Sequence, residues 1–141
     1  MTAKEYLLEI QRCRNRIGAL QAKREELYAQ VGIRAIRYDV DRVQTSMEDK
    51  LEKIAPQLLE LSQEYDAAIK RYHETIRIRA EQIAGMEKEV HEEVLRLRYI
   101  ETDRRGQRLQ FDEIAKRMHR APDRVRHIHG EALREFADKY L

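Results

Sequence analysis

Several residue types that shape compact folds are scarce in this sequence. It has no tryptophan and only two prolines, and 6% of its 141 residues are aromatic whereas 38% are charged. Leu, Ile, Glu, Arg and Ala dominate instead, a composition typical of long helices flanked by solvent. The apolar fraction of 42% is too high for a disordered chain. The composition therefore predicts an all-α protein.

Cysteine and long apolar runs are also missing. Cys13 is the single cysteine, so no intrachain disulfide and no cysteine-based zinc site can form. No run of about 18 apolar residues is present to span a membrane. The N-terminus lacks the apolar stretch of a signal peptide. We therefore expect a cytoplasmic protein without a membrane partner.

The signatures of common catalytic and cofactor sites are absent as well. There is no P-loop, no glycine-rich dinucleotide fingerprint and no Ser/His/Asp or Cys/His order. His119, His127 and His129 could suggest a metal site, but His127 and His129 are two residues apart and point to different faces of a helix. His129 lies toward an apolar stripe, where we expect a partly buried core residue. The sequence thus predicts no enzyme activity, no cofactor and no metal.

The N-terminal region, residues 1–84, reads as two long coiled-coil-like helices. Thr2 and Glu5 have the spacing of a capping box, which satisfies free amide groups at a helix start. Apolar residues then follow steps of three and four, as in a coiled-coil seam, up to an end near Gly32, a residue type that suits the left-handed position after a helix. The seam consists of Ala3, Tyr6, Ile10, Cys13, Ile17, Leu20, Leu27 and Val31.

A connection over residues 32–46 precedes the second long helix. It has too many apolar residues for a solvated linker, so we expect an ordered segment that lies on another element. Ser46 and Asp49 offer a second helix cap, and the seam then continues, with Pro56 predicting a kink or a fresh helix start. The two helices could form an antiparallel hairpin or a dimeric bundle. Because one hairpin leaves apolar positions uncovered, we expect a homodimer.

The C-terminal region, residues 85–141, reads as a small three-helix module. A helix over residues 87–100 and a polar loop over 101–110 come first. Two short amphipathic helices follow within residues 111–136, separated by a break before Pro122, which lacks an N–H and suits a first helical turn. Helix, tight turn and helix describe a helix-turn-helix. A module of this size has marginal stability alone, so we expect it to rest on the long helices or on a second subunit.

Positive charge is concentrated in the last third of the chain. Residues 1–94 carry 16 Lys and Arg against 18 Asp and Glu, whereas residues 95–141 carry 12 against 8. In the last helix, an apolar stripe that begins at Val125 leaves a polar and mostly cationic face outward. A DNA duplex suits such a face best, since arginine clamps phosphate and reads guanine. The face comprises Asp123, Arg124, Arg126, His127, Gly130 and Arg134.

Two stretches of the C-terminal region carry a family resemblance. They read EVLRLRYI, which closes the helix over residues 87–100, and FDEIAKRMHRAPDRVRHIHGEALREF, which covers residues 111–136. Together they resemble region 4 of bacterial sigma-70 factors, a module that reads promoter DNA in the major groove. The whole layout resembles the ArpU-like late transcriptional regulators of Gram-positive phages and prophages. The resemblance implies a sequence-specific, DNA-binding regulator of transcription.

The resemblance also assigns roles to individual side chains. It implies base contacts from Asp123, Arg124 and His127, near the start of the recognition helix. It implies phosphate contacts from Arg120 and Arg126. Double-stranded DNA is therefore the expected partner.

One departure from the family pattern affects the expected affinity. Region 4 usually has Ser or Thr as the cap of this helix, whereas this chain has Ala121, which forfeits roughly 0.5–2 kcal/mol of helix-end stability. Tight binding by one copy is then harder to reach. The alternative function is an adaptor or inhibitor that binds RNA polymerase or a sigma factor. The basic face favours DNA, because a protein-binding mimic would need more exposed apolar surface.

Overall fold

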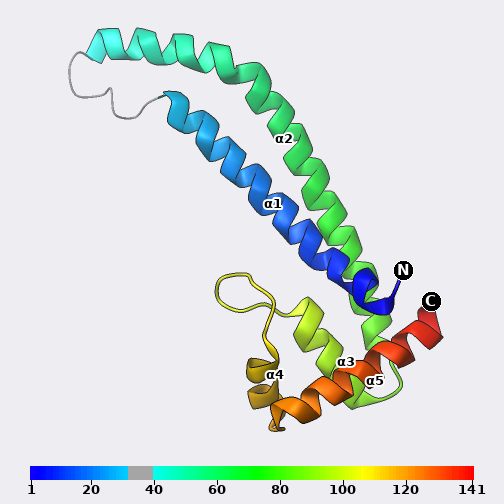
Figure 1. Ribbon diagram of the computed structural model, residues 1–141. Coiled ribbons are helices and arrows are strands. Elements are labelled where there is room, and N and C mark those ends of the chain that lie inside the picture. The colour runs from blue at the N-terminus through cyan, green and yellow to red at the C-terminus, as the bar shows by residue number, and fades with distance from the viewer. Residues whose placement is uncertain (32–39) are drawn as a thin grey trace. The chain divides into compact units, whose positions relative to one another are not determined.

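The structure, a computed structural model, describes residues 1–31 and 40–141 (Figure 1). Within these ranges every regular element is a helix and a single isolated β-bridge occurs, so the predicted all-α class is confirmed. None of the described helices combines the length and apolarity that crossing a membrane requires. In chain order the elements are α1 (Ala3–Val31), α2 (Val40–Ala84), α3 (Glu89–Leu95), the π-helical turn η2 (Arg96–Ile100), α4 (Phe111–Met118) and α5 (Pro122–Tyr140).

The chain divides into two compact units. The first consists of Met1–Cys13 together with Tyr72–Leu141, and the second consists of Arg14–Arg71. The first unit therefore contains the predicted module over residues 85–141 and, in addition, the start of α1 and the end of α2. The sequence places a boundary near residue 84 by following chain order, whereas this unit joins segments that are far apart in the chain.

α1 begins with the capping box that the sequence predicts. The backbone N–H of Thr2 donates to Glu5 Oε2 at 3.0 Å, and the N–H of Glu5 donates to Thr2 Oγ1 at 3.1 Å. The two side chains thus satisfy amide groups that a helix start leaves free. α1 extends to Val31, and the predicted role of Gly32 after it lies outside the described residues.

α2 begins earlier in the chain than the sequence predicts. It begins at Val40, so the predicted connection is wrong over its last residues, and Ser46 lies inside the helix rather than at its cap; residues 32–39 of that connection lie outside the described residues. No Gly or Pro follows Val40 before Pro56, and other poor helix formers cost only roughly 0.5 kcal/mol each. The helix also continues through Pro56 without a second start, and Figure 1 shows it curving along its cyan-to-green stretch.

The first unit is held together by one hydrophobic cluster to which all of its helices contribute. Leu7 and Ile10 of α1 and Ile83 of α2 are at most 1% exposed. Arg79 of α2 reinforces this packing by donating to Glu9 Oε2 at 2.6 Å. The C-terminal helices thus rest on the long helices, one of the two expected supports. The helices contribute Val94, Leu95, Leu97, Tyr99, Ile114, Ala115, Met118, Val125, Ile128, Ala132 and Phe136, and the loop before α4 contributes Leu109.

The predicted helix over residues 87–100 is α3 followed by η2, where the backbone widens. The N–H of Glu101 donates to the carbonyl of Arg96, five residues back, at 3.0 Å, which is the π-helical pattern. Leu97, Arg98 and Tyr99 are all buried. Three consecutive buried residues do not belong to an amphipathic α-helical stripe, so apolar spacing in the sequence does not predict this turn.

The second unit consists of the long stretches of α1 and α2 and has little buried apolar surface. Among residues 14–31 and 48–71, whose side chains the structure describes, Leu20, Val31 and Ile54 are the buried hydrophobic side chains. A polar contact also joins its two helices, with Arg16 Nη2 3.3 Å from Glu64 Oε2. A helix pair with so small a core is marginally stable by itself.

Candidate nucleic-acid interface

The end of α4 fixes the backbone of the three-residue connection to α5. His119 adopts the left-handed conformation, with φ 54° and ψ 46°, which His tolerates better than most residues with a side chain. The His119 N–H donates to the carbonyl of Lys116 at 3.3 Å, and the Arg120 N–H donates to the carbonyl of Ala115 at 3.0 Å. These two bonds form a Schellman motif, which satisfies the last carbonyls of α4 and directs the chain away from it.

α5 starts at Pro122 without a side-chain cap. Ala121 occupies the cap position and accepts no amide hydrogen bond through its side chain, as its residue type predicts. Pro122 has no N–H to satisfy, and its fixed φ suits the first helical position. Asp123 places a carboxylate in the first turn, where the helix dipole favours negative charge. The start of α5 is thus defined by Pro122 and Asp123 instead of a capping hydroxyl.

The two faces of α5 differ in burial as the apolar stripe predicts. Val125 and Phe136 are fully buried, and Ile128 and Ala132 are at most 1% exposed. The opposite face is exposed to solvent, and so is Arg120 in the connection between α4 and α5. All the predicted contact residues are exposed, namely Arg120, Asp123, Arg124, Arg126, His127 and Arg134.

Arg126 is held by neighbouring carboxylates. Its Nη1 lies 2.9 Å from Asp123 Oδ1, and its Nη2 lies 3.9 Å from Asp112 Oδ1 at the start of α4. Its guanidinium also lies 5.8 Å from the centre of the Phe111 ring. These charged side chains are at least half exposed, so the ion pairs add little stability. They do mean that the charge of Arg126 is already matched within the protein.

A second set of charged groups joins the exposed face of α5 to α3. His127 Nε2 lies 2.8 Å from Glu131 Oε1, and the other carboxylate oxygen of Glu131 lies 3.5 Å from His91 Nε2. His91 is buried, and its Nδ1 lies 2.5 Å from Glu135 Oε2. Burial raises the pKa of the Glu135 carboxyl, but the hydrogen bond and charge of His91 shift that pKa downward overall. The network therefore links the exposed His127, through Glu131, to the buried His91.

Three exposed arginines on this surface stay unpaired. Within the part of the chain that the structure describes, Arg120, Arg124 and Arg134 have no hydrogen-bond or ion-pair partner. Arg120 lines an open hollow of about 550 Å³ between α4 and the start of α5, together with Lys116 and His119. Arginines without internal partners can bind an external anion through their forked N–H groups.

His129 belongs to the core, as predicted, and its exposed fraction is 9%. Its ring makes an edge contact with Phe111, with the ring centres 5.1 Å apart. Among the described residues no group of three or more His, Cys, Asp and Glu side chains is arranged to hold a metal ion.

Two parts of this surface have no role in the sequence prediction. Arg108 and Arg117 line a cleft beside α4, and buried His91 lies beneath the exposed face of α5. The spacing of Asp103 and Gly106 could have predicted the tight turn beside this cleft, because Asp and Gly favour the first and last positions of such turns. No sequence signal pairs His91 with carboxylates on α5, since the contact depends on how two helices meet.

The exposed face of α5 thus combines unpaired arginines with a histidine and an aspartate that have partners in the protein. Such a face can bind an extended anion through the arginines and exchange hydrogen bonds through the other two side chains. Comparison of the chain with protein-family models, with curated proteins and with solved structures gave no match.

Proposed function

We propose that this protein is a sequence-specific DNA-binding regulator of transcription, with α4 and α5 as its helix-turn-helix and α5 as the recognition helix. The contrast between the two faces of α5 carries the proposal. Val125, Ile128 and Phe136 lock one face into the core, while Arg124 and Arg134 lie unpaired on the other. A helix supported in this way can enter the major groove without giving up its packing. The resemblance to phage-type late regulators supports the same function.

Arg124 is the residue we assign to base reading. It lies in the first turn of α5, where a helix in the major groove brings side chains to base edges. Its guanidinium is exposed and unpaired, so two of its N–H groups can donate to O6 and N7 of one guanine. His127 follows one turn later and is oriented by Glu131, which gives it a defined direction for a hydrogen bond to a base. Asp123 contacts Arg126 through Oδ1, which leaves Oδ2 to accept from a cytosine.

We assign the phosphate contacts to cationic side chains at the edge of this face. Arg120 lies in the connection that precedes α5, next to Lys116 in the open hollow. Arg134 lies further along the exposed face. Contacts of this kind position a protein on the duplex and carry no sequence information.

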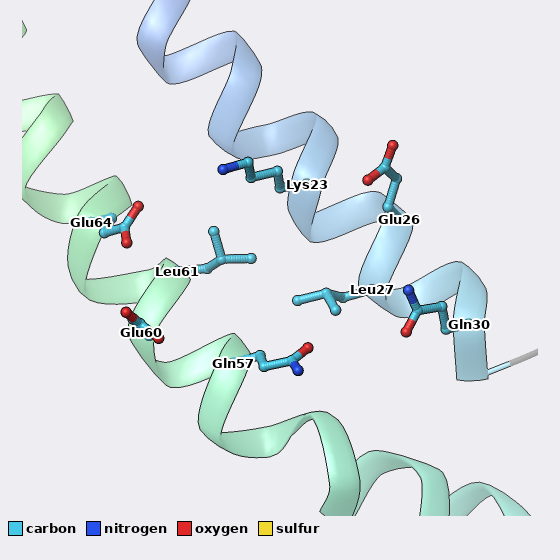
Figure 2. A pocket seen from close by; sticks show the side chains of 8 residues that line it. All are labelled: Lys23, Glu26, Leu27, Gln30, Gln57, Glu60, Leu61 and Glu64. Atoms are coloured by element: carbon cyan, nitrogen blue, oxygen red, sulfur yellow. The ribbon is translucent and has the colours of Figure 1, made fainter.

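We further propose that the protein is a homodimer that joins through the second unit. The groove between α1 and α2 in this unit has a volume of about 370 Å³. Figure 2 shows Leu27 and Leu61 pointing toward one another across it, with polar side chains around them. Both leucines are only half-buried. A second copy presents the same leucines, so a symmetric bundle would cover apolar surface that one helix pair leaves open.

Electrophoretic mobility-shift assays test the DNA-binding proposal. The wild type should shift duplexes from phage late promoters in the presence of excess unrelated DNA. Arg120→Ala/Arg124→Ala should abolish this selective shift. Arg12→Ala/Arg77→Ala removes two exposed arginines of the same unit away from α5, and it should bind like the wild type. Equal loss in both variants, or capture of RNA polymerase by a protein that shifts no DNA, would favour the adaptor function instead.

A further inference from the structure

Between η2 and α4 the chain forms a hairpin, residues 102–108, within the yellow loop of Figure 1. Thr102 and Arg108 pair across it as an antiparallel bridge. The Gly106 N–H donates to the carbonyl of Asp103 at 3.1 Å, and Gly106 has a φ of 75°. A residue with a side chain rarely adopts that φ. The sequence predicts only a polar loop here, whereas the structure has a defined turn.

Asp103 organises the backbone of this hairpin. Its N–H donates to the carbonyl of Gln107 at 2.8 Å. Its Oδ1 accepts from the N–H of Arg105 at 2.8 Å and from the N–H of Gln107 at 2.9 Å. A short side chain that bonds its own turn in this way restricts the turn to one conformation. Arg104 and Arg105 are therefore presented on a backbone of fixed shape.

The hairpin and α4 enclose a cleft of about 450 Å³ with an excess of positive charge. Arg104, Arg108 and Arg117 line it, together with the carboxylates of Asp103 and Glu113. The Asp103 carboxylate accepts from the turn amides, and Glu113 Oε1 lies 3.5 Å from Arg117 Nε. Arg104 and Arg108 have no ion-pair partner among the described residues. The cleft thus has one surplus positive charge, and neither Arg104 nor Arg108 makes a direct ion pair within the described structure.

Arg98 adds a buried cation to the same segment. Its exposed fraction is 9%, and its Nη1 donates at 2.5 Å to the carbonyl of Leu109, which lines the cleft. Its Nε is buried with no hydrogen-bond partner in the described structure. Burial and the like charge of Arg108 both lower the pKa of Arg98. A buried cation without a carboxylate partner is costly, and an anion bound nearby would offset that cost.

We propose that this cleft binds a phosphate group of the DNA backbone between Arg104 and Arg108, and so anchors the duplex that α5 reads. The inference rests on the proposed function. α4 separates the cleft from the hollow beside α5: Arg117 lines the cleft, while Lys116 and Arg120 line the hollow. Basic side chains therefore flank α4 on both sides. This arrangement suits the first helix of a helix-turn-helix, which crosses the phosphate backbone.

The variant Arg104→Ala/Arg108→Ala tests the charge of the cleft. Loss of one phosphate contact should reduce the salt slope of log K by about one and weaken binding about fivefold near physiological salt. The loss should be equal on promoter and unrelated duplexes, because phosphate contacts carry no sequence information. Arg12→Ala/Arg77→Ala removes the same charge elsewhere and should leave the slope unchanged. The same slope in the cleft variant and the wild type would overturn the inference.

Two substitutions of Asp103 separate a shaped site from simple charge attraction. Asp103→Asn and Asp103→Ala both remove one negative charge, but only Asn keeps an oxygen that can accept from the turn amides. Asp103→Asn should bind DNA at least as tightly as the wild type. Asp103→Ala should bind several-fold more weakly than Asp103→Asn, although the two have the same net charge. Equal affinity of the two variants would contradict a cleft that depends on the hairpin.

The outcomes distinguish this inference from the function on which it rests. A wild-type protein that binds no duplex DNA overturns both. If the wild-type protein selects promoter DNA, and Arg104→Ala/Arg108→Ala changes neither the affinity nor the salt slope, only the proposed phosphate site in the cleft is contradicted. Thermal melting of each variant confirms that it is folded before its affinity is compared.

Discussion

The hydroxyl oxygen of Tyr99 lies 2.8 Å from Nε2 of His129, and the two stacked rings have their centres 5.7 Å apart. Burial raises the pKa of Tyr99 to about 12. Burial, followed by the charges of Arg98 and other cations, lowers the pKa of His129 to about 4. Both side chains are therefore neutral near pH 7, and the tautomer of His129 decides which of the two groups donates. This bond ties η2 to α5 inside the core.

Stability should fall on mild acidification because of His129. In the unfolded chain its pKa returns to about 6.5, so below that pH the unfolded state binds a proton that the folded state accepts only near pH 4. The free energy of unfolding should therefore decrease between these two pH values, by up to about 3 kcal/mol. Urea titrations at several pH values between them measure the effect.

His129→Gln supplies the control for this acid effect. Gln is neutral at every pH and keeps an oxygen that can accept from Tyr99. Its absolute stability is expected to be lower, but its pH profile should be flatter than that of the wild type. His73→Gln, at an exposed position of α2, should keep the wild-type profile. Parallel profiles for the wild type and His129→Gln would show that His129 does not cause the acid effect.

Arg124→Ala should separate sequence reading from general affinity. Removal of a guanine contact worth ~1–3 kcal/mol should lower affinity for the specific duplex about tenfold or more. Binding to random DNA and the melting temperature should change little, because Arg124 is exposed and unpaired. Competition binding with the two kinds of duplex measures the difference. Equal losses on both duplexes would place Arg124 on the backbone.

The Asp123–Arg126 ion pair predicts unequal roles for two arginines. Arg120→Ala should reduce the salt slope of log K by about one on every duplex. Arg126→Ala should reduce it less, because Asp123 already matches the charge of Arg126. Asp123→Asn frees Arg126 and should therefore steepen the slope. A larger effect from Arg126→Ala than from Arg120→Ala would show that the pair opens completely on binding.

Gly130 lies on the exposed face of α5, between His127 and Arg134, and a Cβ built there meets no atom within 4 Å. Gly130→Ala should therefore stabilise the fold by about 1 kcal/mol. It should also weaken DNA binding, because the added methyl group holds the duplex away from the backbone of α5. Gly18→Ala on α1 meets equally open space and should stabilise without weakening binding. Unchanged affinity in Gly130→Ala would place the duplex elsewhere.

The dimer proposal can be tested in solution through Leu27, which lines the groove of the second unit. Sedimentation equilibrium at tens of micromolar should give the mass of a dimer for the wild type. Leu27→Glu places a charge on apolar surface that the partner would cover, where burial of a leucine is worth about 1.5–3 kcal/mol, and it should shift the protein toward monomer. Ala22→Glu introduces the same charge at an exposed position of α1 and should remain dimeric. A wild-type monomer at this concentration would rule out the proposed interface.

Much of the fold follows from local sequence features. The capping box at Thr2 and the apolar stripe from Val125 to Phe136 act within one or two helical turns, so spacing alone predicts them. The start of α2 is not singled out in this way, because Asp41, Thr45 and Ser46 are all residue types that can cap a helix, and residue type alone does not choose among them. Residue spacing in one stretch also cannot reveal that α1 and α2 each contribute to the core of the C-terminal module.

In the candidate site, too, local spacing predicts some features and tertiary packing decides the others. The exposure of Arg124 and His127 follows from their position opposite the apolar stripe. The contact of Arg126 with Asp112 joins two helices at an angle set by the Schellman motif after α4. The contact of His91 with Glu135 likewise links residues 44 positions apart. Contacts of this kind depend on tertiary packing, which is why residue types and spacing leave them undetermined.

The π-helical turn at Arg96–Ile100 inserts the equivalent of one residue into an otherwise regular helix. Each residue of an α-helix advances about 100° around its axis, so the turn changes the direction of its own side chains before the chain becomes extended at Glu101. Tyr99 would point away from His129 if one residue of the turn were deleted. Any alignment of this chain with a protein that lacks the turn therefore needs a one-residue gap here. Without that gap, inward positions on one chain would be matched to outward positions on the other.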